Sequence, residues 1–279
     1  MQIGWWCLCC DYFKSFTLSA IFAKNSNLLS HQSYNGRIGE PFIELFTIDS
    51  TNNYAMAQAH AGLATHGAVY IAEVQTAGKG QRTKNWLTNP GQNITMSCVL
   101  SPQGPNTSRP FLLSAAIALG CHDFFNRHTR GDTLIKWPND IYWRDRKAGG
   151  ILIENVYRAN QWQFSIAGIG LNINQSQFPN DLRNPVSLKQ ITGKDHDRLS
   201  LARELCNCLE YRYQQFMQER NSLLEDYNTA LYKRNEKVRL KKDNSVFETA
   251  ITGVSLNGQL HTRDTLERQF DFGDVEWVI

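Results

Sequence analysis

The 279 residues are 42% hydrophobic, 11% aromatic and 20% charged, a composition typical of a globular chain that excludes a disordered or fibrous protein. The 29 Lys and Arg residues nearly balance the 26 Asp and Glu residues, so the formal net charge of +3 does not indicate a protein that coats nucleic acid. The longest apolar run after residue 40, at 111–121, is too short for a bilayer, which needs roughly 20 residues, so we expect no membrane contact.

The seven cysteines, at positions 7, 9, 10, 98, 121, 206 and 208, do not suggest a disulfide framework, because their number is odd and three crowd the N-terminus. Cys7 and Cys10 have C-x-x-C spacing, but no second Cys or His pair follows at the distance that a zinc site requires. A reducing compartment fits best, and we expect a cytoplasmic protein.

Residues 1–40 differ from the rest and are interpreted as an N-terminal extension outside the core. A single basic residue, Lys14, precedes the weakly apolar stretch, so a secretory signal is not indicated. The segment is also too short for a helix-turn-helix, so no DNA-binding domain and no DNA partner are expected.

From residue 41 the pattern predicts strands and helices in alternation. A strand at 42–48 leads through the N-cap types Asp49, Ser50 and Thr51 into a helix at 53–66, which Gly67 ends. Strands at 68–74 and 93–100 precede a helix at 109–128 with Pro110 in its first turn. Strands are then expected at 133–136, 141–143, 150–154, 161–167 and 170–173, followed by helices up to 233.

After residue 234 the composition changes to short strands separated by turn residues. Strands are predicted at 237–240, 247–254, 259–261 and 275–279, with Asn257-Gly258 as a hairpin turn. A small β-barrel at 234–279 is the simplest interpretation.

The first motif that could carry chemistry is the loop at 75–86. Gly78 and Gly80 allow the backbone to approach a ligand, and Lys79, Arg82 and Lys84 supply the positive charge that a phosphate or carboxylate needs. Trp86 closes the loop with a large apolar side chain and could form part of a lid. Alone, the same pattern also suits an ordinary solvated turn.

The second motif combines K-W-P-N-D at 136–140 with K-A-G-G-I-L-I-E at 147–154. The proline forces an extended turn at a strand end, after which Asn139 and Asp140 could hold a base edge or a magnesium ion. An ordinary β-turn is the alternative. Two shorter motifs, G-I-G-L-N-I at 168–173 and D-S-T-N at 49–52, could equally be a bulged strand and a helix N-cap.

Taken in order, these motifs resemble those of the biotin protein ligases, over residues 41–279. The resemblance implies an α+β fold, with a catalytic domain at 41–233 similar to class II aminoacyl-tRNA synthetases and to biotin and lipoate ligases. It also implies an SH3-like β-barrel at 234–279. The implied reaction is ATP-dependent ligation of biotin, through biotinyl-5′-AMP, to a lysine of the biotin carboxyl carrier protein, with Mg²⁺ as cofactor.

The resemblance also assigns roles to residues. Lys147 and Lys79 match catalytic positions, and Asp140 matches a magnesium contact. Lys136 could either reach a phosphate or support its turn. The biotin-binding positions are Ser50, Thr51, Asn52, Gln75, Gly78, Lys79, Gly80, Gln81, Trp86, Lys147 and Gly149; the ATP-binding positions are Lys79, Arg82, Lys136, Asn139, Asp140 and Asn172.

The loop departs from the family's more common G-R-G-R-R-G. Lys79 and Gln81 stand where arginine is usual, and Thr83 stands where glycine is usual. Lysine lacks the bidentate fork of arginine, so we expect Lys79 to hold the adenylate less specifically.

Three other functions stay open at this stage. A lipoate or octanoate ligase or transferase would share the fold, a nucleic-acid-binding module would use the basic loop, and a scaffold would use neither. A ligase without repressor activity is the preferred interpretation, as a monomer or a homodimer.

Overall fold

The computed structural model describes residues 36–279 except 83–84, 104, 181, 219–221 and 279. The predicted extension at 1–40 therefore lies almost entirely outside the described residues. The described residues belong to one compact unit, Asn35–Ile279, which contains two β-sheets. No helix in this described part is long and apolar enough to span a bilayer.

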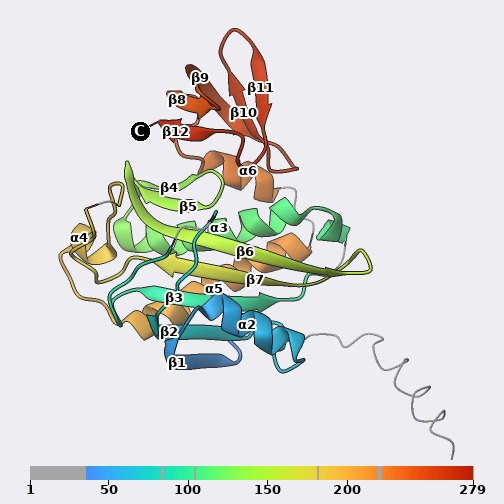
Figure 1. The fold of residues 1–279 in the computed structure, drawn as a ribbon, viewed down its shortest axis with the longest axis vertical. Helices are drawn as coiled ribbons and strands as arrows, with labels where there is room; N and C mark the ends of the chain where they lie inside the picture. The colour runs from blue at the N-terminus through green and yellow to red at the C-terminus, as the bar shows by residue number, and fades with distance from the viewer. Residues whose placement is uncertain (1–35, 83–84, 104, 181, 219–221, 279) are drawn as a thin grey trace, which may run out of the picture. The chain divides into compact units, whose positions relative to one another are not determined.

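The larger sheet has seven strands in the order β1-β2-β3-β7-β6-β5-β4 (Figure 1). The β1 and β2 strands run parallel, and the other neighbours run antiparallel. The strands are β1 (Phe42–Ile48), β2 (Val69–Gln75), β3 (Ile94–Leu100), β4 (Thr133–Lys136), β5 (Asp140–Trp143), β6 (Arg146–Arg158) and β7 (Gln161–Leu171). Every strand predicted up to 167 is present.

One predicted interruption is wrong: 161–167 and 170–173 do not form separate strands. Gly168 and Gly170 continue β7, since each is paired with β3 on one side and with β6 on the other. A glycine inside a strand generally weakens it, but here the ladder is complete on both sides and the strand continues.

Two long helices, α3 (Pro110–Thr129) and α5 (Arg198–Met217), pack against each other and bury one face of this sheet. The predicted stripe of Leu201, Leu205, Leu209 and Tyr213 lies in this core. Four free cysteines, Cys98, Cys121, Cys206 and Cys208, are buried there, and burial raises the pKa of each thiol, that of Cys206 to about 12.

The helix α2 (Thr51–His60) covers part of the opposite face, where it packs with Tyr70, Val99 and Ile166. The prediction of a helix up to residue 66 is wrong, because Gly62 adopts a left-handed conformation, with φ of 69°, directly after the C-cap. The short elements are η1 (Pro105–Ser108), α4 (Leu188–Thr192) and α6 (Ser222–Thr229).

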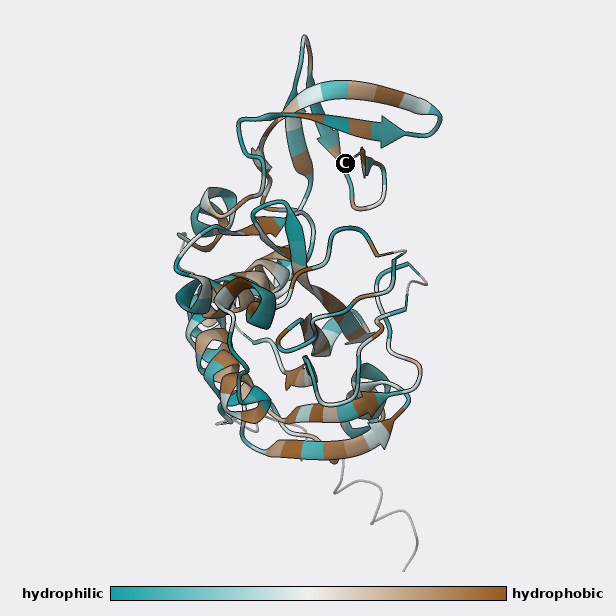
Figure 2. Cartoon of the chain, turned by 90° about the vertical axis from the view of Figure 1, so that its left-hand side faces the viewer, coloured by the Kyte–Doolittle hydropathy of each residue, from teal (hydrophilic) through white to brown (hydrophobic). Residues whose placement is uncertain are grey.

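The smaller sheet is antiparallel, in the order β11-β10-β9-β8-β12. Its strands are β8 (Lys237–Lys242), β9 (Ser245–Val254), β10 (Leu260–Arg263), β11 (Glu267–Phe270) and β12 (Glu276–Val278). Figure 2 shows hydrophobic and hydrophilic bands alternating along these strands, and Leu240, Ile251 and Leu260 are fully buried. The sequence did not indicate β11, whose E-R-Q-F has one apolar residue.

Candidate active site

Three glycines form a side-chain-free strip on the sheet face that α2 partly covers. Gly150 of β6 is paired with Gly170 of β7, and Gly168 lies two residues before Gly170, so all three share one face. A Cβ atom on Gly168 would lie 2.2 Å from Asn52 Oδ1, and one on Gly170 would lie 2.3 Å from Trp86 Cε2. Side chains from α2 and from the 75–86 loop therefore rest directly on the backbone of this glycine strip.

Trp86 is held over the strip by its own loop. Its backbone N–H donates to Gly78 O at 2.9 Å, and a Cβ atom on Gly78 would lie 2.4 Å from Trp86 O and 2.6 Å from Gln75 Nε2. Only glycine fits there. The indole Nε1 of Trp86 is buried and has no hydrogen-bond partner among the described residues. An unpaired buried donor costs free energy, so this group favours a ligand that can accept from it.

A polar cluster lies beside the strip, where α2 begins. Gln75 Oε1 accepts from the Thr51 backbone N–H at 2.7 Å and from Thr51 Oγ1 at 3.0 Å. Ser97 Oγ lies 2.8 Å from Thr51 Oγ1 and 2.6 Å from Asn52 Oδ1. Asn52 Nδ2 donates to Glu154 Oε2 at 2.7 Å.

The structure thus brings together three residues that the sequence analysis assigned to biotin, and adds Ser97 and Glu154, which it did not assign. Ser97 left one signal, a hydroxyl in the otherwise apolar centre of β3. Ser50, the N-cap of α2, is 2% exposed, and its side chain makes no capping bond.

Lys79 lies on the exposed side of the loop, where its backbone forms an isolated bridge with Asn85. Hydrogen bonds from the Asn53 amide and the Ser50 backbone hold the pKa of Asp49 below its usual value, and the charge of Lys79 acts in the same direction. Gly80 is half-buried.

The pair formed by Asp140 and Lys147 lies at the other end of the strip. Lys147 Nζ donates to Asp140 Oδ1 at 2.7 Å, and both side chains are about a quarter to a third exposed. A Cβ atom on Gly150 would lie 3.4 Å from Asp140 Oδ1 and 3.6 Å from Lys147 Nζ. The glycine strip therefore has Asn52 and Trp86 over one part and the pair of Asp140 and Lys147 beside the other.

Asn172 fixes the backbone around Lys147. Its Nδ2 donates to Val186 O at 3.1 Å and to Lys147 O at 3.4 Å, while its backbone N–H donates to Ala148 O. Gly149 is equally restricted, because a Cβ atom there would lie 2.6 Å from Gly170 O. The sequence predicted a nucleotide contact for Asn172; in this structure its amide nitrogen holds main chain.

Asn139 has a similar structural connection. Its backbone carbonyl accepts from Ile151 N at 3.0 Å, and its side-chain amide donates to Ile151 O. These contacts join the K-W-P-N-D turn to β6, so they set the position of Asp140 relative to Lys147.

A cavity of about 540 Å³ lies between the loop, β6, α3 and the smaller sheet. Gln81, Arg82 and Asn139 line it together with Phe111 and Phe272. The guanidinium carbon of Arg82 is 5.1 Å from the centre of the Phe272 ring. The structure thus places Gln81 and Arg82 against this cavity, whereas Gly78 and Trp86 meet the glycine strip; Thr83 and Lys84 lie outside the described residues.

Lys136 is directed toward the smaller sheet. It is only 7% exposed, and its Nζ donates to Tyr142 OH at 3.1 Å. Of the two roles that the sequence left open, these contacts favour support of the turn over contact with a phosphate.

Within the described residues, no group of three or more His, Cys, Asp or Glu side chains could hold a metal ion. Mg²⁺ at nucleotide sites commonly takes one or two carboxylates and completes its shell with phosphate oxygens and water. The single carboxylate of Asp140 fits that mode.

Comparison with known proteins agrees with this geometry. Residues 45–173 match the model of the biotin/lipoate A/B protein ligase family. The bifunctional ligase/repressor BirA of Bacillus spizizenii is 34% identical over 184 residues, which cover 64% of this chain and 56% of that protein, so the chain spans about half the length of this relative.

Solved structures show the same fold. The biotin protein ligase from Aquifex aeolicus in complex with biotin and ATP has a TM-score of 0.71 at 21% identity and covers 84% of this chain and 98% of its own. The biotin--[acetyl-CoA-carboxylase] ligase of Mycobacterium tuberculosis is 30% identical over 195 residues, 69% of this chain and 71% of that protein. With these motifs, this fold and this degree of identity, the chain belongs to the biotin protein ligase family.

Proposed function

We propose that this protein joins biotin to a lysine of the biotin carboxyl carrier protein of acetyl-CoA carboxylase, in two steps that use ATP. The observation that carries the proposal is the pairing of Lys147 with Asp140 beside a glycine strip that Trp86 covers. Relatives named as biotin--[acetyl-CoA-carboxylase] ligases, from M. tuberculosis and Paracoccus denitrificans, support this acceptor. We place the reaction in the cytoplasm.

Biotin is proposed to lie along the glycine strip. Because the Trp86 indole rests on the backbone of β7 at Gly170, the fused rings would lie beside the indole, and the ureido group would meet Thr51 and Gln75. Apolar walls with a few placed polar groups are typical of small-molecule sites. The unpaired Nε1 of Trp86 then gains an acceptor.

Adenylation brings two anions together. A biotin carboxylate oxygen forms a bond to the α-phosphorus of ATP while the bond to pyrophosphate breaks. Lys147 is placed to neutralise charge on both groups, and such preorganised charge is worth about 10²–10³ in rate. Mg²⁺, held by Asp140 and the phosphates, would neutralise the triphosphate.

In the second step, a neutral lysine amine of the acceptor attacks the acyl carbon and expels AMP, and the amine loses its proton. Lys79, Arg82 and Asn139 are proposed to retain the adenylate until then. Lys79 lies on the exposed side of the loop, and Arg82 and Asn139 line the cavity of about 540 Å³.

The test is exchange of labelled pyrophosphate into ATP with biotin, lipoate and octanoate as parallel acids. We expect exchange with biotin alone and its loss in Lys147→Ala. Lys189→Ala is the matched control, because Lys189 forms an ion pair of the same 2.7 Å length with Asp195. Exchange with lipoate or octanoate instead would assign the protein to the lipoate branch. No exchange with any acid, or parental exchange in Lys147→Ala, would refute the proposed chemistry.

A further inference from the structure

Lys136 is a buried cation at the contact between the two sheets. Its side chain comes from the end of β4, and the residue is 7% exposed. Its Nζ lies 4.8 Å from the centre of the Tyr142 ring and 5.1 Å from the centre of the Trp277 ring. A buried ammonium is costly unless its charge is compensated, and aromatic faces and a hydroxyl provide such compensation.

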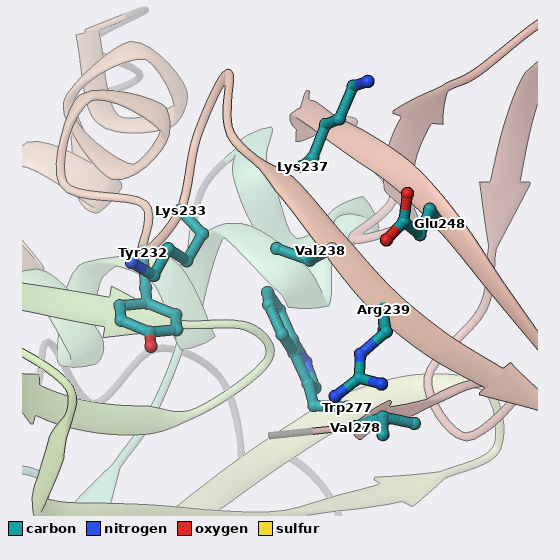
Figure 3. Close-up of a pocket in the computed structure, with 8 residues that line it drawn as sticks. All are labelled: Tyr232, Lys233, Lys237, Val238, Arg239, Glu248, Trp277 and Val278. Carbon is teal, nitrogen blue, oxygen red and sulfur yellow. The ribbon is translucent and has the colours of Figure 1, made fainter.

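The aromatic partners of Lys136 join both sheets. Tyr142 belongs to β5, and Trp277 belongs to β12 of the smaller sheet. The ring of Tyr232 lies 5.1 Å from that of Tyr142 and 5.8 Å from that of Trp277, centre to centre. Tyr232 and Trp277 also line a hollow of about 300 Å³, together with Lys237 and Arg239 (Figure 3).

Tyr142 is a neighbour of Asp140 and Lys147 in the larger sheet. It lies two residues after Asp140 on β5, and it is the partner of Lys147 in the register of β5 and β6. The register of β5 with β6 shifts between Ile141 and Tyr142, but that of β5 with β4 is regular through both residues, so Tyr142 and Asp140 lie on the same side of β5. The position of the Tyr142 ring therefore bears on the ion pair between Asp140 and Lys147.

The turn between Lys136 and Asp140 is also held by residues that follow it in the chain, from α6 and from the smaller sheet. Trp137 Nε1 donates to Gly258 O of the smaller sheet's hairpin at 2.9 Å, and Tyr227 OH donates to Pro138 O at 3.1 Å. Both ends of the segment that supplies Asp140 thus depend on residues from the C-terminal part of the chain.

We propose that Lys136 and Trp277 are positioning residues for the adenylation step. The ammonium of Lys136 links Trp277 to Tyr142, and through Tyr142 it keeps Asp140 and Lys147 in the arrangement that the reaction needs. This inference rests on the proposed function. It assigns Lys136 a role through protein contacts, since its ammonium lies between two aromatic rings.

The experiment measures biotin-dependent pyrophosphate exchange with biotin and ATP varied separately. We expect Lys136→Met to lower kcat about tenfold. Its KM for biotin should stay within about twofold of the parent, because the contacts of Thr51 and Gln75 are untouched. Lys136→Arg keeps the charge and the ring contact and should recover most of the rate. Lys242→Met is the matched control, since Lys242 Nζ lies 5.6 Å from the Phe270 ring on the exposed side of β8, and it should match the parent.

A double variant with Lys136→Met and Trp277→Leu tests whether Lys136 and Trp277 act as one unit. Trp277→Leu should lower kcat as Lys136→Met does, and the double variant should lose no more than the worse single variant. Trp277→Leu carries the prediction alone if Lys136→Met does not fold. Additive losses, unchanged kcat, or a raised KM for ATP at parental kcat would overturn the inference. An inactive parent would overturn the proposed function together with this inference. An active parent whose variants behave as in the previous sentence would overturn this inference alone.

Discussion

Replacing Gly170 by alanine should move Trp86 off the glycine strip. The three heavy atoms nearest to a Cβ at this position all belong to the Trp86 indole, at 2.3, 2.5 and 2.7 Å. Carbon atoms in contact are ~3.5–4.0 Å apart, so the indole must retreat by about 1 Å. The backbone of β7 cannot yield, because Gly170 is paired with Thr95 on one side and Gly150 on the other.

The size of the effect follows from the cost of overpacking. An added methyl group in a well-packed site costs about 1–3 kcal/mol. If Trp86 has to lie flat on the glycine strip for biotin to bind, the whole free-energy cost of overpacking appears as a loss of affinity for biotin. Since about 1.4 kcal/mol corresponds to a tenfold change, biotin binding should weaken by about 5- to 150-fold.

Isothermal titration calorimetry with biotin measures this change, with thermal unfolding as a check on folding. Gly253→Ala is a control, because it adds the same methyl group to a strand of the smaller sheet, 3.1 Å from Asn228 Oδ1. In a Trp86→Ala background the whole indole is gone, so Gly170→Ala should cost much less. Parental affinity in Gly170→Ala, or an equal loss in both backgrounds, would refute the reasoning.

Three further predictions concern Lys79, Asn172 and the buried His66. Lys79→Ala should release free biotinyl-adenylate, which chromatography of the reaction mixture would detect; equal release from the parent would contradict it. Asn172→Ala leaves the carbonyl of Val186 without its Asn172 donor, while the carbonyl of Lys147 keeps only the Val186 N–H, so exchange should fall about tenfold and stability by about 1–3 kcal/mol, and parental values for both would disprove this. Burial lowers the pKa of His66 below its usual 6.5, so the unfolded chain takes up the proton first and stability should fall as pH drops below 6.5. His66→Gln should flatten that dependence in urea unfolding between pH 7.5 and 5.5; an unchanged slope would argue against it.

The sequence predicted most of the larger sheet because its strands alternate or are continuously apolar. The bounds of β1 and β4 agree with the prediction residue by residue. One failure concerns information that lies elsewhere in the chain. The interruption at Gly168 was expected from glycine's local preference, whereas strand pairing on both sides decides the outcome.

In the candidate site, too, residues in local motifs could be predicted, and residues that depend on distant parts of the chain could not. Thr51, Gln75, Trp86 and Lys147 could be assigned from ordered motifs, and the structure connects them along one face. The surroundings of Lys136 could not be predicted, because its partner Trp277 lies in another sheet and follows no local pattern. Ser97 was missed because a hydroxyl residue in a mostly apolar strand, which also contains Thr95, has no distinctive spacing.

The hydrogen bond from Trp137 to Gly258 has a consequence for biosynthesis. A ribosome makes the chain from the N-terminus, so the strands that carry the glycine strip and Lys147 emerge well before Gly258 and Trp277. Until those residues emerge, the turn before Asp140 has no partner for its indole, and Lys136 has no second aromatic ring. Nascent chains should therefore form the pairing of the larger sheet before the contacts that Trp137 and Lys136 make with the smaller sheet.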